Sequence, residues 1–261
     1  MNFLNNLEKK VSKNFLSKGY IINKVNSKES LNYITLLVKQ TIKNVTKKNC
    51  YNLNKFHNKI SFNSLNEVRL KIISRINNDP NLRFHYFNLA RDMIYILAGN
   101  ELMMQKNINL SIQFPHDKSS LLPIHSDVWS GDSPFEINLW VPLVDCYNTK
   151  SMYILEQKLH ENFIRLMRKK NLSSSEEIFK TFKKKVKWLK VNYGEFLIFN
   201  QSLPHGNVVN LEDETRWSMN CRFKSFFSPY GDKKIGEFFL PITTRAMTEV
   251  GINFKYPFKN S

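Results

Sequence analysis

Three short segments in the second half of the chain carry residue types that could hold a metal ion. His125 and Asp127 lie two residues apart in LPIHSDVW, and His205 lies in FNQSLPHGNVVN. Two imidazoles and one carboxylate are the ligand set of a facial non-heme Fe(II) site, which leaves coordination positions open for other molecules. Arg216 follows in ETRWSMNCRF, and a guanidinium there could pair in a bidentate way with a carboxylate-bearing cosubstrate.

The sequence around these residues strengthens the metal hypothesis. A His-x-Asp triplet alone is a weak signal, but His205 follows a turn at Gly194 and the buried-strand pattern 196–199, and Arg216 comes shortly after it. We therefore expect strand ends to project the three ligands toward one point. The four remaining histidines have no comparable context; they are His57, His85, His116 and His160.

The second half of the chain alternates in the manner of β-strands. Segments 108–114, 135–141 and 215–223 largely alternate between polar and apolar residues, so each should place mainly one kind of side chain on each face. The segment 125–129 places His125, Asp127 and Trp129 on one face. In 215–223 one face carries Arg216, Ser218, Asn220 and Arg222. Several polar faces together predict a barrel with a polar interior, covered outside by helices.

Helical patterns fill most of the first 105 residues, for example at 30–38, 67–76 and 89–98, with Ser30 as a possible N-cap. A helical insertion is expected at about 156–183, with Ser173-Ser174-Ser175-Glu176 as a plausible helix start. The expected fold class is α+β. We expect one domain over 1–261, with mainly helical support in 1–105 and the β-rich part in 106–261.

Composition narrows the class of protein. The net charge of +17 comes from scattered lysines among abundant Asn and Ile, so we expect no nucleic-acid partner. The three cysteines are far apart and form no CxxC unit, which disfavours a disulfide framework or a zinc ribbon. No apolar run is long enough for a membrane span, and the N-terminus lacks the pattern of a signal peptide, so a cytoplasmic location is expected. The sequence leaves the oligomeric state open.

Four segments of the chain resemble those of a known enzyme family. The segments IHSDVW, INLWVPLVD, GEFLIFNQSLPHGNVVN and ETRWSMNCRF are similar to those of 2-oxoglutarate and Fe(II)-dependent oxygenases of the phytanoyl-hydroxylase-like type. More narrowly, HSDVWSGDSPFEINLWVPLVD, SMYIL and RFKSFFSPYGDKKIGEFFLPITTR resemble oxygenases found sporadically in bacterial carbohydrate-biosynthesis clusters. The likeness covers residues 105–255. SMYILEQ stands where the family's Gly-Ser-His signal is expected, which puts the substrate-side loop in doubt.

The resemblance implies a double-stranded β-helix, the jelly-roll or cupin-like barrel, with Fe(II) and 2-oxoglutarate as cofactors. It implies His125, Asp127 and His205 as catalytic metal ligands, and Arg216, assisted by Ser218, as the anchor of 2-oxoglutarate. Gln113 and Asn138 are further candidates for the cofactor pocket. Trp129, Trp140 and Arg222 are candidates for substrate contacts, and Arg222 is also the alternative anchor because it shares the strand face of Arg216.

The function implied is hydroxylation by O2 of a small molecule, sugar-like or anionic, of the sugar or nucleotide-sugar type. Two alternatives remain open at this stage. A metal-dependent cupin-like sugar isomerase or epimerase would use the same barrel without needing Arg216. A non-enzymatic carbohydrate-binding protein would keep the residues without the chemistry. A protein or nucleic-acid hydroxylase would require a continuous basic stripe leading to the iron, which the dispersed lysines do not suggest.

Overall fold

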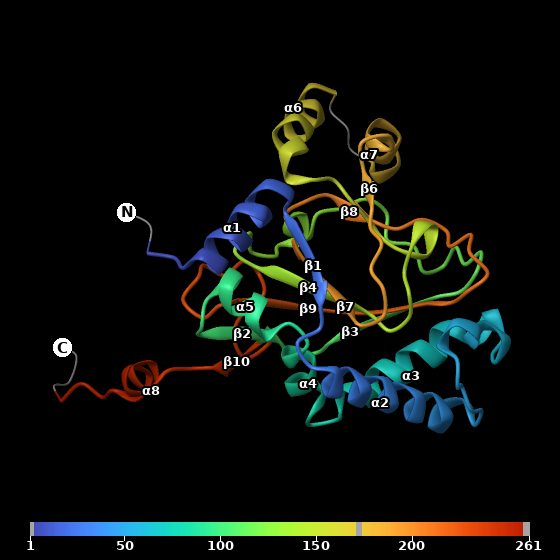
Figure 1. Ribbon diagram of the computed structural model, residues 1–261, viewed down its shortest axis with the longest axis horizontal. Helices are drawn as coiled ribbons and strands as arrows, with labels where there is room; N and C mark the ends of the chain where they lie inside the picture. Colours follow the sequence, from blue (N-terminus) through green and yellow to red (C-terminus); the bar gives the residue numbers. More distant parts are fainter. Residues whose placement is uncertain (1–2, 171–173, 258–261) are drawn as a thin grey trace.

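The computed structural model describes residues 3–170 and 174–257. Two antiparallel sheets form the barrel, and most helices come from the N-terminal part of the chain (Figure 1). Helices α2, α3 and α4 lie together on one side of the larger sheet, whereas α6 and α7 stand near the smaller sheet. The expected α+β class, with a double-stranded β-helix and N-terminal packing helices, is confirmed.

The larger sheet has the strand order β1-β7-β4-β9-β2-β10, and β3 pairs with β9 beside β2. Its strands are β1 (Tyr20–Lys24), β2 (Leu102–Gln105), β3 (Asn109–Gln113), β4 (Ile137–Pro142), β7 (Glu195–Asn200), β9 (Arg216–Ser225) and β10 (Phe239–Thr243). The smaller sheet has the order β6-β5-β8, formed by β5 (Tyr153–Ile154), β6 (Lys187–Trp188) and β8 (His205–Gly206).

The helices are mainly in the first hundred residues. They are α1 (Asn6–Lys18), α2 (Lys28–Thr46), α3 (Leu65–Asn77), α4 (Leu82–Asn88), α5 (Arg91–Ala98), α6 (His160–Lys170), α7 (Ser175–Phe182) and α8 (Ala246–Asn253). Short 3-10 helices are η1 (Leu53–Asn58), η2 (Phe62–Ser64), η3 (Asp127–Ser130), η4 (Asn148–Lys150) and η5 (Gln157–Leu159). Among the described residues, no helix combines the length and apolarity that crossing a bilayer requires; the cytoplasmic location stays a prediction.

Helix α2 shows why the N-terminal part covers the sheet. Its buried residues recur every three or four positions, so they form one apolar stripe: Leu31, Ile34, Val38 and Ile42. The helix begins earlier than expected. Ser27, rather than Ser30, is the N-cap, and its side chain accepts a hydrogen bond from the Ser30 backbone N–H at 3.0 Å. Ser30 lies inside the first turn.

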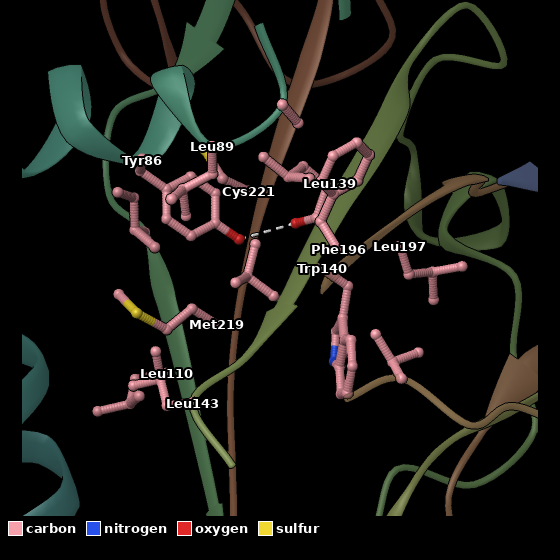
Figure 2. Close-up of a cluster of buried hydrophobic side chains, with 14 of the residues drawn as sticks. Tyr86, Leu89, Leu110, Leu139, Trp140, Leu143, Phe196, Leu197, Met219 and Cys221 are labelled. Atoms are coloured by element: carbon pink, nitrogen blue, oxygen red, sulfur yellow. Dashed lines mark hydrogen bonds between the residues drawn. The ribbon is translucent and has the colours of Figure 1, made fainter. Parts of the chain in front are cut away.

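The main hydrophobic core lies between the helices and the outer face of β9. That face carries side chains that are fully buried, as the alternation of 215–223 predicts: Trp217, Met219, Cys221 and Phe223. Tyr86 of α4 is buried against this layer, and its hydroxyl donates to the Leu139 carbonyl of β4 at 2.9 Å (Figure 2). Because a buried hydroxyl needs a partner, this bond fixes α4 against the sheet.

The helical insertion has a small core of its own. Phe163 of α6 packs with Ile178 and Phe182 of α7 and with Tyr153 of β5. Helix α7 begins after Ser174, whose side chain forms a capping box with Glu177; Ser173, named in the expected helix start, lies outside the described residues. The insertion therefore rests on the smaller sheet, close to the strand that carries His205.

Two local elements differ from the sequence expectation. Strand β1 lies within the mainly helical N-terminal part and pairs with β7 at the sheet edge. Residues Asp127–Ser130 form the 3-10 helix η3 instead of continuing a strand from His125. Gly131, with φ of 87°, ends this turn, which is a backbone conformation that glycine adopts without strain.

Candidate metal centre

The structure brings the His-x-Asp pair and the distal histidine together. Ligand atoms of His125, Asp127 and His205 all lie within 4.8 Å of one another. His125 Nε2 is 3.5 Å and His205 Nε2 is 3.9 Å from Asp127 Oδ1. These separations suit three ligands that share one ion, since metal–ligand bonds to nitrogen or oxygen are about 2 Å long.

Backbone pairing places the two histidines side by side. His125 and His205 form an antiparallel bridge in which each backbone N–H donates to the other's carbonyl, at 2.9 and 2.8 Å. The backbone N–H of Asp127 then donates to the Gln201 carbonyl at 3.1 Å. Three backbone bonds thus hold the ligand-bearing segments in register before any metal binds.

Both imidazoles are oriented for metal binding through Nε2. Nδ1 of His125 lies 2.8 Å from the Pro123 carbonyl, and Nδ1 of His205 lies 2.8 Å from the Leu203 carbonyl. A carbonyl only accepts, so each Nδ1 must carry the proton. Neutral imidazoles then present the Nε2 lone pair toward Asp127. This second layer of hydrogen bonds is a regular feature of histidines that ligate metals.

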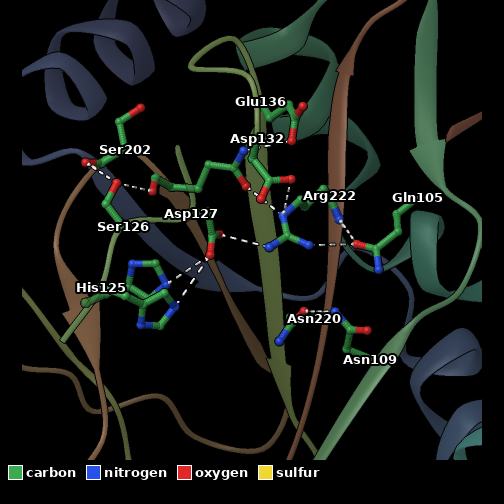
Figure 3. Close-up of polar contacts among 12 residues, drawn as sticks. Gln105, Asn109, His125, Ser126, Asp127, Asp132, Glu136, Ser202, Asn220 and Arg222 are labelled. Carbon is green, nitrogen blue, oxygen red and sulfur yellow. Dashed lines mark hydrogen bonds and ion pairs between the residues drawn. The ribbon is translucent and has the colours of Figure 1, made fainter. Parts of the chain in front are cut away.

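Arg222 holds the other oxygen of Asp127. Its Nη2 is 3.3 Å from Asp127 Oδ2, and its Nε donates to Gln201 Oε1 at 2.9 Å (Figure 3). The same guanidinium is 3.6 Å from Asp132 Oδ1 and reaches Gln105 Oε1 at 3.5 Å. Arg222 is therefore neutralised by two carboxylates of this chain, and it leaves Oδ1 of Asp127 facing the histidines.

The electrostatics of the cluster follow from burial and from these pairs. Burial raises the pKa of Asp127, but the His125 hydrogen bond and the charges of His205 and Arg222 outweigh it and hold the pKa well below its usual range. Burial lowers the pKa of His205 to about 4. For His125, burial is the largest single effect and lowers the pKa, but the contact with Asp127, the Pro123 carbonyl and the charge of Asp127 together outweigh it, so the net pKa is raised. An ionised carboxylate beside a neutral His205 is the state that a divalent ion requires.

Arg216 lies in the same cavity, and no carboxylate of the described residues is within ion-pair distance of it. Its side chain is buried; Nη2 donates to Ser111 Oγ at 2.9 Å and Nη1 to the Ser151 carbonyl at 3.4 Å. Its Nε is buried without a hydrogen-bond partner, and within the described part of the chain Arg216 forms no ion pair. Burial lowers its pKa. A buried guanidinium with only neutral partners is costly, so this position suits an anion from outside the chain.

The cavity between the two sheets has a volume of about 250 Å³. The polar face expected for 215–223 lines it in full, since Arg216, Ser218, Asn220 and Arg222 all reach it. Its other walls are Asn109, Ser111, Leu122, His125, Asp127, Asn138, Trp140, Met152, Phe199, His205, Gly206 and Asn207. The cavity therefore joins the three-residue cluster to both arginines of β9.

The remaining sequence-predicted residues fall into two groups. Ser218, Asn138 and Trp140 line the cavity, and the Oδ1 atom of Asn138 is buried without a partner. Gln113 and Trp129 are not among the lining residues. Gln113 pairs with Arg216 across the strands and donates to the Val208 carbonyl at 2.9 Å. Trp129 is 48% exposed and stacks on Phe163 of α6.

Several cavity residues went unnoticed in the sequence. Ser111 and Asn109 alternate on β3 in the register of the inner face, which is the signal that could have identified them. Asn109 donates to Asn220 at 2.8 Å (Figure 3). Gly206 is required by close approach: a Cβ there would lie 2.6 Å from the Tyr153 hydroxyl and 2.8 Å from the Leu122 carbonyl. The glycine thus lets β8 carry His205 against its neighbours.

Comparison with solved structures identifies the architecture. The chain is similar to the non-heme monooxygenase ThoJ in its nickel complex, with a TM-score of 0.56, 13% identity and coverage of 90% of this chain and 84% of that one. It is similar to the non-heme alpha-ketoglutarate-dependent carbocyclase SnoK from nogalamycin biosynthesis, with a TM-score of 0.56, 14% identity and coverage of 91% and 97%. It is also similar to EctD from S. alaskensis, solved with 2-oxoglutarate and 5-hydroxyectoine. The TM-score is 0.56, the identity is 14%, and the likeness covers 86% of this chain and 79% of that one.

Comparison of amino-acid sequences finds weaker similarity than comparison of structures. No family model matches the chain. A streptomycin biosynthesis protein, StrG of Streptomyces griseus, is 28% identical over 114 residues, which is 42% of this chain and 42% of that protein. The match thus spans less than half of the relative. Taken with the architecture and the three-residue cluster, the comparisons show that this chain has the non-heme iron, 2-oxoglutarate-dependent oxygenase fold of the phytanoyl-hydroxylase-like type.

Proposed function

We propose that this protein is an Fe(II)- and 2-oxoglutarate-dependent oxygenase that hydroxylates a small sugar-like molecule. The observation that carries the proposal is one cavity that contains both a two-histidine, one-carboxylate cluster and a buried arginine without a carboxylate partner. The cluster supplies the ligand set of non-heme Fe(II) oxygenases. The arginine supplies what a dicarboxylate cosubstrate needs once one of its ends is bound to the metal.

Each residue has a defined task in this proposal. His125 Nε2, His205 Nε2 and Asp127 Oδ1 would hold Fe(II), while Arg222 keeps the second oxygen of Asp127 turned away. Arg216 and Ser218 would bind the distal carboxylate of 2-oxoglutarate. Bound iron and 2-oxoglutarate supply the oxidising chemistry, in which O2 hydroxylates a substrate C–H bond while 2-oxoglutarate becomes succinate and carbon dioxide. The chain contributes positioning and the exclusion of water by side chains such as Phe199 and Met152.

The cavity walls favour a polyhydroxylated substrate. Asn109, Asn138 and Asn220 offer amide groups, and Trp140 offers a ring face, a combination that suits hydroxyl groups and the C–H face of a sugar. Arg222 is already paired with Asp127 and Asp132, which leaves Arg216 as the cavity's one guanidinium without a carboxylate in the described residues. With that one given to 2-oxoglutarate, the part of the substrate that enters should be neutral. A free sugar or the sugar end of a nucleotide sugar fits this requirement.

The first test is anaerobic titration of the full chain with Fe(II) and 2-oxoglutarate, followed by visible absorption. We expect the bound complex to show a weak charge-transfer band at about 500 nm, where iron chelates with this ligand set absorb. The band should be absent in His205→Ala and Asp127→Ala, and present in the matched control His160→Ala, which removes an imidazole outside the cavity. Iron binding without the band would refute the oxygenase proposal and favour a cupin-like isomerase. Absence of iron binding would favour a carbohydrate-binding protein.

The substrate class needs a separate measurement. We expect free sugars, cyclitols or nucleotide sugars to raise O2-dependent succinate release above the substrate-free background. Asn220→Leu should lower this stimulation more than it lowers the background rate, because Asn220 lines the cavity without contacting the metal cluster. Stimulation by anionic metabolites alone would contradict the neutral-substrate proposal while leaving the oxygenase proposal standing. We expect neither a nucleic-acid partner nor nucleic-acid stimulation of the reaction.

A further inference from the structure

A second cavity lies away from the metal cluster, between α4, α5 and β10. Its volume is about 390 Å³, and its walls include Arg83, Arg91, Phe84, Phe87, Tyr95 and Thr243. Phe87 packs on Phe223, whose side chain belongs to the outer, helix-covered face of β9. The metal cluster lies on the opposite face of the same strand, so the two cavities are separated by the sheet.

Arg83 is the unusual residue of this second cavity. Its Nη2 donates to the Met104 carbonyl at 3.3 Å, and its Nε is buried without a hydrogen-bond partner. Burial lowers its pKa, and no carboxylate acts on it to raise the pKa. A guanidinium that has lost part of its hydration normally gains a carboxylate in exchange. Within the described residues Arg83 has none, which leaves its capacity to bind an anion unused.

Arg91 adds a second positive charge to the same cavity. Its guanidinium carbon lies 6.0 Å from the ring centre of Phe87 and 5.5 Å from that of Tyr95. Neither arginine forms an ion pair in the part of the chain that the structure describes, and the lining includes no acidic residue. Two like charges facing one cavity repel each other, and a bound anion would convert that repulsion into attraction.

The rings determine what else the ligand should carry. Phe87 and Tyr95 meet edge to face with centroids 5.7 Å apart, and Phe84 is 63% exposed at the cavity wall. Flat heterocycles stack on such rings, and arginines pair with phosphate in a bidentate way. We propose that this cavity is a second binding site, which takes a small phosphorylated molecule with a flat ring, of the nucleoside monophosphate type. The proposal does not depend on the function of the metal site.

Calorimetric titration of the full chain with adenosine 5′-monophosphate tests the proposal, in low-salt buffer without phosphate. We expect saturable binding of one equivalent, and weaker binding of adenosine and of inorganic phosphate, because each has only half of the recognised chemistry. Arg91 is exposed, so the Arg91→Met variant should fold normally. We expect Arg91→Met and Arg83→Met each to weaken binding of the nucleotide about tenfold or more. Arg91→Lys should retain part of the affinity, because it keeps the charge and loses the planar fork.

The control variant is Arg75→Met, which removes an exposed arginine from the last turn of α3, outside this cavity. We expect its affinity for the nucleotide to equal that of the wild type. Equal losses in Arg75→Met and Arg91→Met would mean diffuse attraction to a chain of charge +17 and would overturn the proposal. The absence of nucleotide binding would also overturn the proposal. A loss of affinity in Arg216→Met as large as that in Arg91→Met would overturn it too, because the nucleotide would then bind inside the barrel. Failure of the chain to bind iron would not affect this result.

Discussion

Strand β9 holds two arginines on the same face, Arg216 and Arg222, in opposite surroundings. At one end, Arg216 is buried with a serine hydroxyl and a backbone carbonyl as its partners. Further along the strand, Arg222 contacts Asp127 and Asp132 and is also held by Gln201. The difference teaches that a guanidinium's partners, rather than its position on a strand, indicate whether it serves the fold or a ligand.

The physical reason is the cost of burying charge. Arg222 is compensated by carboxylates of the same chain, and it orients Asp127 without needing a bound ligand. Arg216 loses hydration and has no carboxylate within ion-pair distance among the described residues, although the charge of Asp117 acts on it. A bound dicarboxylate would restore what burial removed. We therefore assign the 2-oxoglutarate contact to Arg216 and the support of Asp127 to Arg222, as proposals that the following substitutions test.

The largest effect is expected from Arg216→Met. Loss of a buried bidentate pair costs about 2–5 kcal/mol, so the KM for 2-oxoglutarate should rise about thirtyfold or more. The measurement is succinate formation against 2-oxoglutarate concentration, with Fe(II) saturating. Arg216→Lys should recover part of the loss, since it restores the charge without the fork. An unchanged KM for 2-oxoglutarate in Arg216→Met would contradict the proposed contact between Arg216 and 2-oxoglutarate.

A smaller and different effect is expected from Arg222→Met. Asp127 would lose the partner of its Oδ2 atom, and loss of such an outer contact weakens metal affinity about 10- to 100-fold. Anaerobic equilibrium dialysis with Fe(II) measures this change, and the KM for 2-oxoglutarate should stay close to that of the wild type. The reverse outcome, with iron affinity kept and 2-oxoglutarate affinity lost, would exchange the tasks of the two arginines.

The smallest effect is expected from Ser111→Ala. The hydroxyl accepts one hydrogen bond from Arg216 at 2.9 Å, and the loss of one such bond, at about 0.5–1.5 kcal/mol, should raise the KM for 2-oxoglutarate about two- to tenfold. The same kinetic assay applies. Ser61→Ala is the matched control, because its hydroxyl pairs with that of Ser64 and does not line the cavity. A Ser111→Ala variant as impaired as Arg216→Met would mean that the hydroxyl, and not the arginine, dominates cosubstrate binding.

Strand β9 shows what the alternation of polar and apolar residues in the sequence can predict. Both of its faces were predictable, because a strand places successive side chains on opposite sides whatever its neighbours are. The cavity receives Arg216, Ser218, Asn220 and Arg222, and the core receives the residues between them. The helices of the N-terminal part were likewise predictable from their apolar spacing, although the N-cap of α2 is Ser27, three residues before the expected Ser30.

Other features required the folded chain. Strand β1 shows no alternation of polar and apolar residues, and its pairing with β7 supplies the hydrogen-bond partners that make it a strand. The turn of η3 redirects the chain after Asp127, so Trp129 stacks on Phe163 of the insertion instead of sharing a wall with His125. Such packing between segments distant in sequence leaves no local pattern to read.

The sequence by itself determined the ligand types, the polar and apolar faces of the strands, and the helices that cover them, because side-chain chemistry and backbone periodicity are local properties. Only the tertiary structure decided which groups meet. It brought His125 to His205 through a backbone bridge and gave Arg222 two carboxylates, whereas Arg216 has no carboxylate within ion-pair distance among the residues described. Partners, burial and distances depend on contacts between distant segments, and these decide what each charged side chain is free to bind.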